Sequence, residues 1–274
     1  MRLKISHTTE YHYETPVRYS LQRLRLTPRT GPGQTVVDWR TSVHGAHLEA
    51  GYSDHFGNHV DLVSTDADQS TIRILAEGEV ETEDRAGVFG PHQGNVPLWL
   101  YLRETALTKP GKLVRELARA VTGDEGLSRM HALMASIHRE VEYRTGETVS
   151  ETTAEQALEK KSGVCQDHAH VFISAARVMG LPARYVSGYL LMEGTVDQTA
   201  SHAWAEAHIQ GLGWVGFDAA NAVCPDARYV RLASGLDYRD AAPVSGMVVG
   251  FTAETMNVSI KVERGGQGQS QNQS

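Results

Sequence analysis

The stretch SGVCQDHAHVFISAARVMGLP, residues 162–182, decides how the second half of the chain folds. Apolar side chains recur at helical spacing from Cys165 to Met179, and Gly180 and Pro182 follow, as at a conventional helix end. The spacing therefore predicts a helix with Cys165 in its first turn. The unpaired N–H groups and the positive dipole end of such a turn stabilise an anion, and a thiolate is one. A buried cysteine packed as a small apolar residue is the alternative interpretation.

The segments on either side of this helix indicate an α+β fold. Upstream, helical spacing covers residues 112–121 and 127–141, and Thr152 and Thr153 begin overlapping capping-box candidates for a third helix. Downstream, the pattern changes to strands at residues 184–192, 202–209, 214–218, 246–251 and 256–262. Helices followed by a run of strands predict helices packed on an antiparallel sheet.

The first hundred residues show strand patterning and no convincing helix. Residues 3–13 alternate apolar and polar side chains, and further strand-like runs cover residues 34–43, 47–52, 58–64 and 71–81. Clusters of Gly, Pro, Asn and Asp separate these runs. This spacing predicts a β-sandwich-like unit that precedes the helices.

Two further residues could complete a catalytic site with Cys165. His202 begins the strand-like segment HAWAEAH, residues 202–208, in which every second residue faces one way and the alanines face the other. Asp218 ends the segment GLGWVGFD, residues 211–218. A cysteine nucleophile, a histidine base and an aspartate that orients the histidine form an acyl-transfer site, here in the chain order of papain-like enzymes. A solvated strand histidine and a turn aspartate remain the alternatives from the residues alone.

Composition narrows the class of protein. The 274 residues include 26 Lys and Arg against 33 Asp and Glu, so the formal net charge is −7. This balance excludes a generally basic nucleic-acid binder and gives no reason to expect a membrane partner. No apolar run approaches the roughly 18 residues of a membrane-spanning helix, and the first ten residues lack the apolar core of a secretory signal. We therefore expect a cytoplasmic protein.

The cysteines and histidines give no sign of a disulfide framework or a metal site. The two cysteines, Cys165 and Cys224, are consistent with a reducing compartment, and Cys224 stands before a proline in a loop with no helix start beside it. The 13 histidines show no zinc-type spacing with cysteines or carboxylates. The sequence predicts neither a metal nor another cofactor.

Three blocks of sequence resemble the core of the transglutaminase-like superfamily. They are SGVCQDHAH with GLPARYVSGY (residues 162–170 and 180–189), SHAWAE (201–206) and GLGWVGFD (211–218), in the order and spacing of that family. The match covers mainly residues 140–222. The N-terminal part, with its DHFGN motif at residues 54–58, resembles the β-rich region that precedes this core in bacterial members. The one departure is His168, where the family leads us to expect an aromatic residue such as Phe.

The resemblance implies a role for each of the three residues. Cys165 is the implied nucleophile, His202 the base and Asp218 the residue that orients it. The backbone N–H of Cys165 and the side chain of Tyr143 are candidate donors to the oxyanion. Further residues are candidates for lining the site: Gln166, Asp167 and Trp204.

The implied contact between His202 and Asp218 conflicts with the simplest strand pairing. A symmetric hairpin around residues 210–213 would place Ile209 opposite Trp214 and Asp218 opposite Ala205. His202 would then lie about three residues, or roughly 10 Å, further along its strand. A bulge, a skewed register or a bend is needed to bring the two residues together.

The whole chain is therefore expected to contain a β-rich region at residues 1–105, a catalytic core with a papain-like or transglutaminase-like fold at 106–264 and a disordered tail at 265–274. A protease-sensitive junction is expected between residues 87 and 112. The favoured activity is hydrolysis of a peptide or protein amide through a thioester. Transfer of the acyl group to an amine, as in a protein-glutamine transglutaminase, is the first alternative, and an inactive binding scaffold is the second. The oligomeric state stays open.

Overall fold

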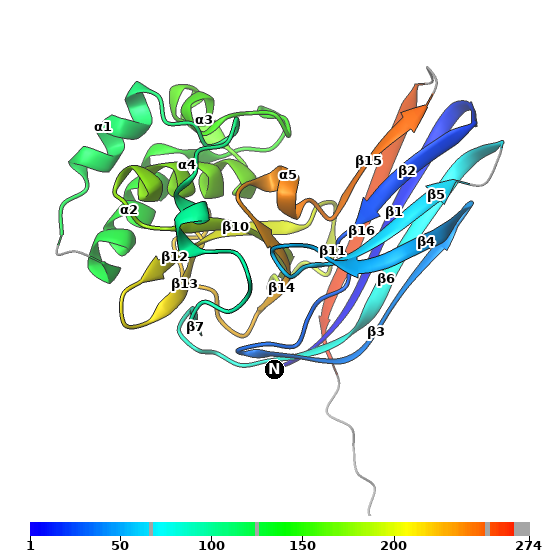
Figure 1. The fold of residues 1–274 in the computed structure, drawn as a ribbon, viewed down its shortest axis with the longest axis horizontal. Coiled ribbons are helices and arrows are strands. Elements are labelled where there is room, and N and C mark those ends of the chain that lie inside the picture. The colour runs from blue at the N-terminus through cyan, green and yellow to red at the C-terminus, as the bar shows by residue number, and fades with distance from the viewer. Residues whose placement is uncertain (66–67, 124–125, 250–252, 266–274) are drawn as a thin grey trace, which may run out of the picture.

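The computed structural model describes residues 1–65, 68–123, 126–249 and 253–265. It has a layered sheet region on one side and a helical region on the other, as Figure 1 shows. The predicted α+β class, with a β-rich N-terminal region and helices packed on an antiparallel sheet, is confirmed. The predicted disordered tail, apart from Gly265, lies outside the described residues.

Two facing sheets make up the sandwich-like region. One has the strand order β11-β16-β1-β6-β3 and the other the order β15-β2-β5-β4. Tyr11, Leu24, Val63 and Ile72 are among the buried side chains between them. The strands of the N-terminal part are β1 (Arg2–Val17), β2 (Tyr19–Leu24), β3 (Gln34–His44), β4 (Ala46–Ser53), β5 (His59–Thr65) and β6 (Gln69–Thr82).

The helical half has its own antiparallel sheet, with strand order β14-β10-β12-β13-β7. Its strands are β10 (Ala183–Leu190), β12 (His202–Ile209), β13 (Gly213–Phe217), β14 (Tyr229–Gly235) and β7 (Val88–Gly90), the last contributed from upstream of the helices. The helices of this half are α1 (Lys112–Ala120), α2 (Leu127–Glu140), α3 (Ala154–Lys160) and α4 (Cys165–Val178), with a 3-10 turn η1 (Leu98–Leu102) before them and the short α5 (Tyr238–Ala241) after β14.

Helix α4 lies at the centre of this half because one face of β12 carries three small side chains in a row. Ala203, Ala205 and Ala207 are all buried in the core that α4 shares, so helix and strand approach closely. The other helices surround α4, and α1 is fixed by a side chain from α3. The Glu155 carboxylate accepts hydrogen bonds from the backbone N–H groups of Gly111, Leu113 and Val114, at 2.7–3.1 Å, where α1 begins.

The last two strands of the chain do not join the sheet of the helical half. The strands β15 (Val244–Val249) and β16 (Glu254–Arg264) pair with β2 and β1 of the sandwich, and the short β11 (Asp197–Gln198) pairs with β16. From the sequence, β15 and β16 were expected in the core at residues 106–264. That placement is wrong because strand pairing across the whole chain leaves no mark on the local pattern.

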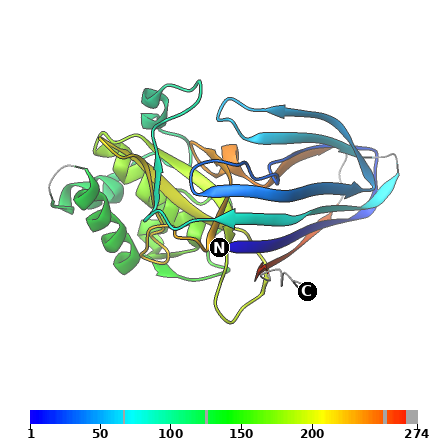
Figure 2. The ribbon, with the colours of Figure 1, turned by 90° about the horizontal axis from the view of Figure 1, so that it is seen from below.

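The two regions also share buried contacts along β1. Leu3 and Ile5 pack into the core of the helical half, whereas Tyr11 and Tyr13 of the same strand pack inside the sandwich. At the crossing, His7 Nδ1 lies 2.9 Å from the hydroxyl oxygen of Tyr189 on β10. Figure 2 shows the start of β1 at the junction between the helical half and the sheets.

Candidate active site

Cys165 is the first residue of α4 and is 9% exposed. The strand pair β8 (Glu142–Tyr143) and β9 (Ser162–Gly163) leads into it. The residue before the helix, Val164, has no side-chain oxygen to cap it. Asp167 instead fixes the start of the helix: its Oδ2 accepts hydrogen bonds from the Val164 backbone N–H at 2.8 Å and from the Thr148 hydroxyl at 2.7 Å. The N–H of Cys165, in the first turn, has no partner within its own helix and can donate to an anion.

His202 begins β12 and is buried beside the cysteine. Its Nε2 lies 2.6 Å from Asp218 Oδ2, so Nδ1 is the nitrogen left for the cysteine. Burial alone would lower the pKa of His202, but the charge of Cys165, a hydrogen bond with the Cys165 side chain and the nearby Asp218 carboxylate raise it to about 10. The imidazolium form is thus favoured through the neutral pH range, as in a thiolate–imidazolium pair.

Asp218 is fully buried and held from several sides. Its Oδ2 accepts hydrogen bonds from the Tyr229 hydroxyl at 2.8 Å and the Asn221 side-chain amide at 2.7 Å, in addition to His202. Its Oδ1 accepts from the backbone N–H groups of Ala220 and Asn221. Burial would raise the pKa of Asp218, but the bond and charge of His202, with the bonds from Asn221 and Tyr229, lower it below its ordinary value.

The conflict over strand pairing is resolved by a one-residue difference in register. The β12–β13 turn pairs Ile209 with Gly213 instead of Trp214, and Ala205 with Phe217. Continuing that alternation places Asp218 opposite Trp204, hence on the face of the sheet that carries His202. The predicted symmetric hairpin is therefore wrong. The chain also bends after Phe217, because Asp218 pairs with Val223 in a tight turn.

The other candidate residues have different surroundings. Tyr143 is 52% exposed, and burial together with the charges of Cys165 and Asp218 raises its pKa to about 12, so its hydroxyl remains a donor at neutral pH. Gln166 is turned toward the preceding loop, where its amide donates to the Ser150 carbonyl oxygen at 3.0 Å. Trp204 stacks on His202 with ring centroids 6.3 Å apart and is 1% exposed, so it backs the histidine instead of lining an open surface.

His168, the departure from the family pattern, is also buried. Its Nδ1 lies 2.8 Å from the Val164 carbonyl oxygen and its Nε2 lies 2.9 Å from that of Val141. The ring thereby links the start of α4 to the end of α2, next to the strand that carries Tyr143. Among the described residues, His168 makes no hydrogen bond with His202 or Asp218, so it does not hold the three proposed catalytic groups in place.

Comparison with known proteins agrees with this fold. Residues 112–219 match the transglutaminase-like superfamily, and residues 3–81 match the bacterial transglutaminase-like N-terminal region. The chain thus carries a transglutaminase-like core after a bacterial transglutaminase-like N-terminal region.

Relatives and solved structures extend the match over nearly the full length of the chain. An uncharacterized protein of Mycobacterium leprae is 29% identical over 282 residues, which cover 96% of this chain and 99% of the relative. An uncharacterized protein of Mycobacterium tuberculosis is 29% identical over 292 residues, which cover 96% and 92%. The crystal structure of a proposed cysteine protease from Cytophaga hutchinsonii shares the fold, with a TM-score of 0.77, 24% identity, and 97% and 92% of the two chains covered.

Sequence reasoning missed two residues of this transglutaminase-like site. Asn221 follows Asp218 by three residues in a loop, a spacing that suits a turn in which an Asx side chain bonds nearby groups, so its position gave a usable signal. Tyr229 comes eleven residues after Asp218 at the start of β14, and no local pattern brings it to the carboxylate. Only the pairing of β14 with β10 does so.

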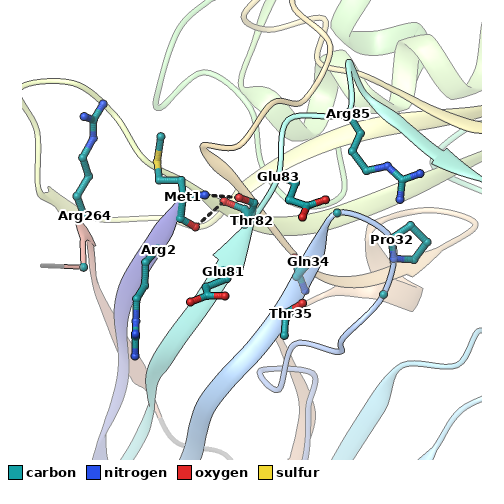
Figure 3. A pocket seen from close by; sticks show the side chains of 13 residues that line it. Met1, Arg2, Pro32, Gln34, Thr35, Glu81, Thr82, Glu83, Arg85 and Arg264 are labelled. Carbon is teal, nitrogen blue, oxygen red and sulfur yellow. Dashed lines mark hydrogen bonds between the residues drawn. The ribbon is translucent and has the colours of Figure 1, made fainter. Parts of the chain in front are cut away.

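A large hollow lies away from these groups. It measures about 1110 Å³ and opens beside the first residues of β1 and the end of β6. Figure 3 shows Arg2 and Arg264 there with their guanidinium groups directed apart, and Glu81 and Glu83 between them and Arg85. Size alone does not make this the active site, because none of the described residues that line it carries a thiol or an imidazole.

Neither a metal centre nor a membrane span is found in the described part of the chain. No three His, Cys, Asp or Glu side chains gather closely enough there to hold a metal ion. Among the same residues, no helix combines the length and the apolar character that crossing a bilayer requires.

Proposed function

We propose that this chain hydrolyses peptide or amide bonds through Cys165, His202 and Asp218. The observation that carries the proposal is the 2.6 Å contact between His202 Nε2 and Asp218, with Cys165 as the hydrogen-bond partner on the other side of the ring. This order, thiol to imidazole to carboxylate, is the arrangement that activates a nucleophile for acyl transfer. The fold shared with a proposed cysteine protease is consistent with it.

The proposed reaction has two halves. The Cys165 thiolate attacks the amide carbon, and the negative oxygen of the tetrahedral intermediate accepts hydrogen bonds from the Cys165 N–H and the Tyr143 hydroxyl. The C–N bond breaks as the imidazolium of His202 gives its proton to the leaving amine, which leaves a thioester. His202 then takes a proton from water, the hydroxide attacks the thioester, and the carboxylic acid leaves as the thiolate and imidazolium are restored.

Asp218 serves this cycle by fixing the ring of His202. Its five hydrogen-bond donors leave it little freedom to rotate, so Nδ1 of the imidazole stays directed toward the thiol. Because the carboxylate also stabilises the imidazolium, its loss would reduce both orientation and charge stabilisation.

A mass-shift assay separates the proposed hydrolysis from its alternatives. The purified chain is incubated with glutamine-containing peptides and with folded protein substrates, with and without a primary amine, and products are read by mass spectrometry. Hydrolysis gives cleaved or deamidated products that form without the amine, and all of them disappear with Cys165→Ala. Amine adducts in place of hydrolysed products would identify a transglutaminase. Products that persist with Cys165→Ala would exclude the proposed mechanism.

A further inference from the structure

A second charged cluster lies on the same face of the sheet of the helical half, further along β12 from His202. Glu206 is fully buried, and its Oε2 accepts hydrogen bonds from Arg184 Nε at 2.5 Å and from Arg231 at 3.2 Å. One carboxylate oxygen thus serves two guanidinium groups. Four residues of extended strand separate Glu206 from His202, or roughly 13 Å, so the cluster is not part of the proposed catalytic triad.

The cluster carries more positive than negative charge. Arg29, from the loop after β2, is close enough that its charge acts on Arg231. Burial and the charges of Arg184 and Arg29 lower the pKa of Arg231 to about 10, although Glu206 opposes this. Arg231 therefore remains protonated at neutral pH. Three guanidinium groups against one carboxylate leave two positive charges uncompensated within the cluster.

These arginines open into a cavity of about 260 Å³. No Asp or Glu is among the described residues that line it, so nothing on its wall offsets the excess charge. The lining residues that matter here are three arginines and three aromatic side chains: Arg29, Arg184, Arg231, Phe56, Phe89 and Trp214.

The aromatic rings hold two of the guanidinium groups in fixed planes. Arg184 lies over the ring of Trp214, with its central carbon 3.9 Å from the ring centroid, and its side chain is 8% exposed. Arg231 lies over Phe89 at 5.6 Å. Its Nε is buried and has no hydrogen-bond partner among the described residues. A buried donor without an acceptor is costly, so the one carboxylate of Glu206 does not satisfy every donor of this cluster. The Arg231 side chain as a whole is 27% exposed and lines the cavity.

We propose that this cavity binds a carboxylate carried on a compact apolar or aromatic body. The carboxylate meets the uncompensated guanidinium charge, since planar guanidinium and carboxylate groups match in shape. The body of the ligand lies against Phe56, Phe89 and Trp214. The volume is slightly below the range of drug-sized ligand pockets and suits a molecule about the size of one aromatic acid.

The large hollow of Figure 3 does not offer the same chemistry. Arg2 there is already paired with Glu79, and Glu81 and Glu83 line the wall beside the arginines. The loop of residues 31–34 borders both spaces, so the two are neighbours, and of their described lining residues the carboxylates belong to the larger space.

The cavity is separate from the proposed catalytic groups. Cys165, His202 and Asp218 do not line it, and α4 covers the opposite face of β12 through the three alanines. A narrower adjoining space shares Arg231 and Phe89 with it and reaches Trp204 and Tyr229, the side chains that contact His202 and Asp218. The proposed site therefore lies behind the triad, and its existence does not rest on the proposed hydrolysis.

Isothermal titration with benzoate tests the proposal on the full chain. Benzamide has the same ring without the charge, and inorganic phosphate has charge without the ring. We expect benzoate to bind and to change Trp214 fluorescence, benzamide to bind at least tenfold more weakly, and phosphate to bind more weakly than benzoate. Benzamide equal to benzoate, phosphate tighter than benzoate, or no benzoate binding at millimolar concentration would each overturn the proposal.

Two variants locate the site. Arg231→Gln should weaken benzoate binding about tenfold or more, because glutamine can still bond Glu206 but has no charge. Arg29→Gln, at an exposed position, should weaken it severalfold even if Arg231→Gln fails to fold. The matched control is Arg115→Gln on the exposed side of α1, which should leave binding unchanged. Equal loss in the control, or no loss with either cavity variant, would contradict the assignment. Arg184 is left intact because its removal would strand the buried Glu206.

Discussion

Tyr229 and Asn221 give Asp218 its fixed position, and neither touches the thiol in the described hydrogen bonds. Their hydrogen bonds are among the causes that lower the pKa of Asp218. A carboxyl whose folded pKa lies below its unfolded value stabilises the protein above the unfolded pKa, and this stabilisation is lost as pH falls through the folded value. The two side chains thus act on His202 through the aspartate.

Tyr229→Phe should lower kcat about tenfold with little change in KM, because the ring remains and only one hydrogen bond to Asp218 is lost. The Asp218 pKa should rise, so the acidic limb of the pH–rate profile should move to higher pH. A matched control is Tyr19→Phe, on the exposed start of β2, which should change neither value. An unchanged acidic limb in Tyr229→Phe would show that the hydroxyl does not act on Asp218.

The two cysteines should react very differently with iodoacetamide at pH 6. The pKa of His202 near 10 means that an imidazolium faces Cys165 at this pH, whereas burial raises the pKa of Cys224. Brief treatment should label Cys165 far ahead of Cys224 and inactivate the protein in proportion, as read by peptide mapping. His202→Ala should remove most of this selectivity. Equal labelling of both cysteines in the unaltered protein would mean that Cys165 is not activated.

The raised pKa of His202 should depend on the thiol. Such a histidine stabilises the folded state fully below its unfolded pKa of about 6.5, and the stabilisation disappears as pH rises through its folded value. In Cys165→Ala the thiolate charge and its hydrogen bond are gone, so the pKa should fall substantially. Imidazole NMR titration of the two proteins measures this directly. The same pKa in both would mean that Asp218 alone sets the charge of the ring.

At the level of elements, the sequence predicted most helices and strands but not how two of them pair. The predicted helix from Cys165 and the strand at 202–209 agree with α4 and β12 within one residue, because periodicity and end signals are local. The triad itself came from family resemblance, since no local pattern brings His202 to Asp218. The register between β12 and β13 was predicted one residue off because it depends on the turn.

Gly213 sets that register. Its φ of +81° lies in the left-handed region, and a Cβ there would lie 2.0 Å from the Gly90 carbonyl oxygen on β7. Gly211 has a similar φ of +83°, but a Cβ there would meet nothing within 4 Å. An alanine at either position would take on the strain of the left-handed backbone, but an alanine at Gly213 would also clash with Gly90. Comparing the two substitutions therefore separates the cost of the strain from the cost of the clash.

Gly213→Ala should lower the free energy of unfolding by about 3 kcal/mol or more and should sharply reduce activity, because the strand that ends at Asp218 must shift. Gly211→Ala should cost only about 1 kcal/mol and should largely keep activity. Guanidinium denaturation and the peptide assay measure both effects. Equal losses in the two variants would show that the contact with Gly90 does not hold the turn.

At the level of the whole molecule, the predicted boundaries at residues 105 and 264 do not follow the strand pairing. β7 belongs to the sheet of the helical half, while β15 and β16 belong to the sandwich. Pairing between segments some two hundred residues apart has no local signature, so a boundary drawn from composition and period could not place them. Strands from both ends of the described chain pair within the sandwich, β1 with β16 and β2 with β15.

A protease cut between residues 87 and 112 should therefore leave one particle. The N-terminal fragment keeps β1 and β2, and the C-terminal fragment keeps β16 and β15. β16 pairs with β1 from Leu3 opposite Arg264 to Tyr13 opposite Glu254, and β15 pairs with β2. The nicked protein should elute at its original volume in native gel filtration and should yield two bands only after denaturation. Separate elution of the fragments without denaturant would mean that these strand contacts do not hold the halves together.

The position of β16 beside β1 also affects how the protein is made. Leu3 pairs with Arg264, so about 260 residues are translated between the two partners. At roughly 5–20 residues per second, the nascent β1 waits on the order of 10 to 50 seconds with one edge uncovered, although β6 reaches its other edge much earlier. An uncovered strand edge can pair with another chain. Ribosome-bound chains of this protein should accordingly be most prone to aggregate, and most dependent on chaperones, until β16 has emerged.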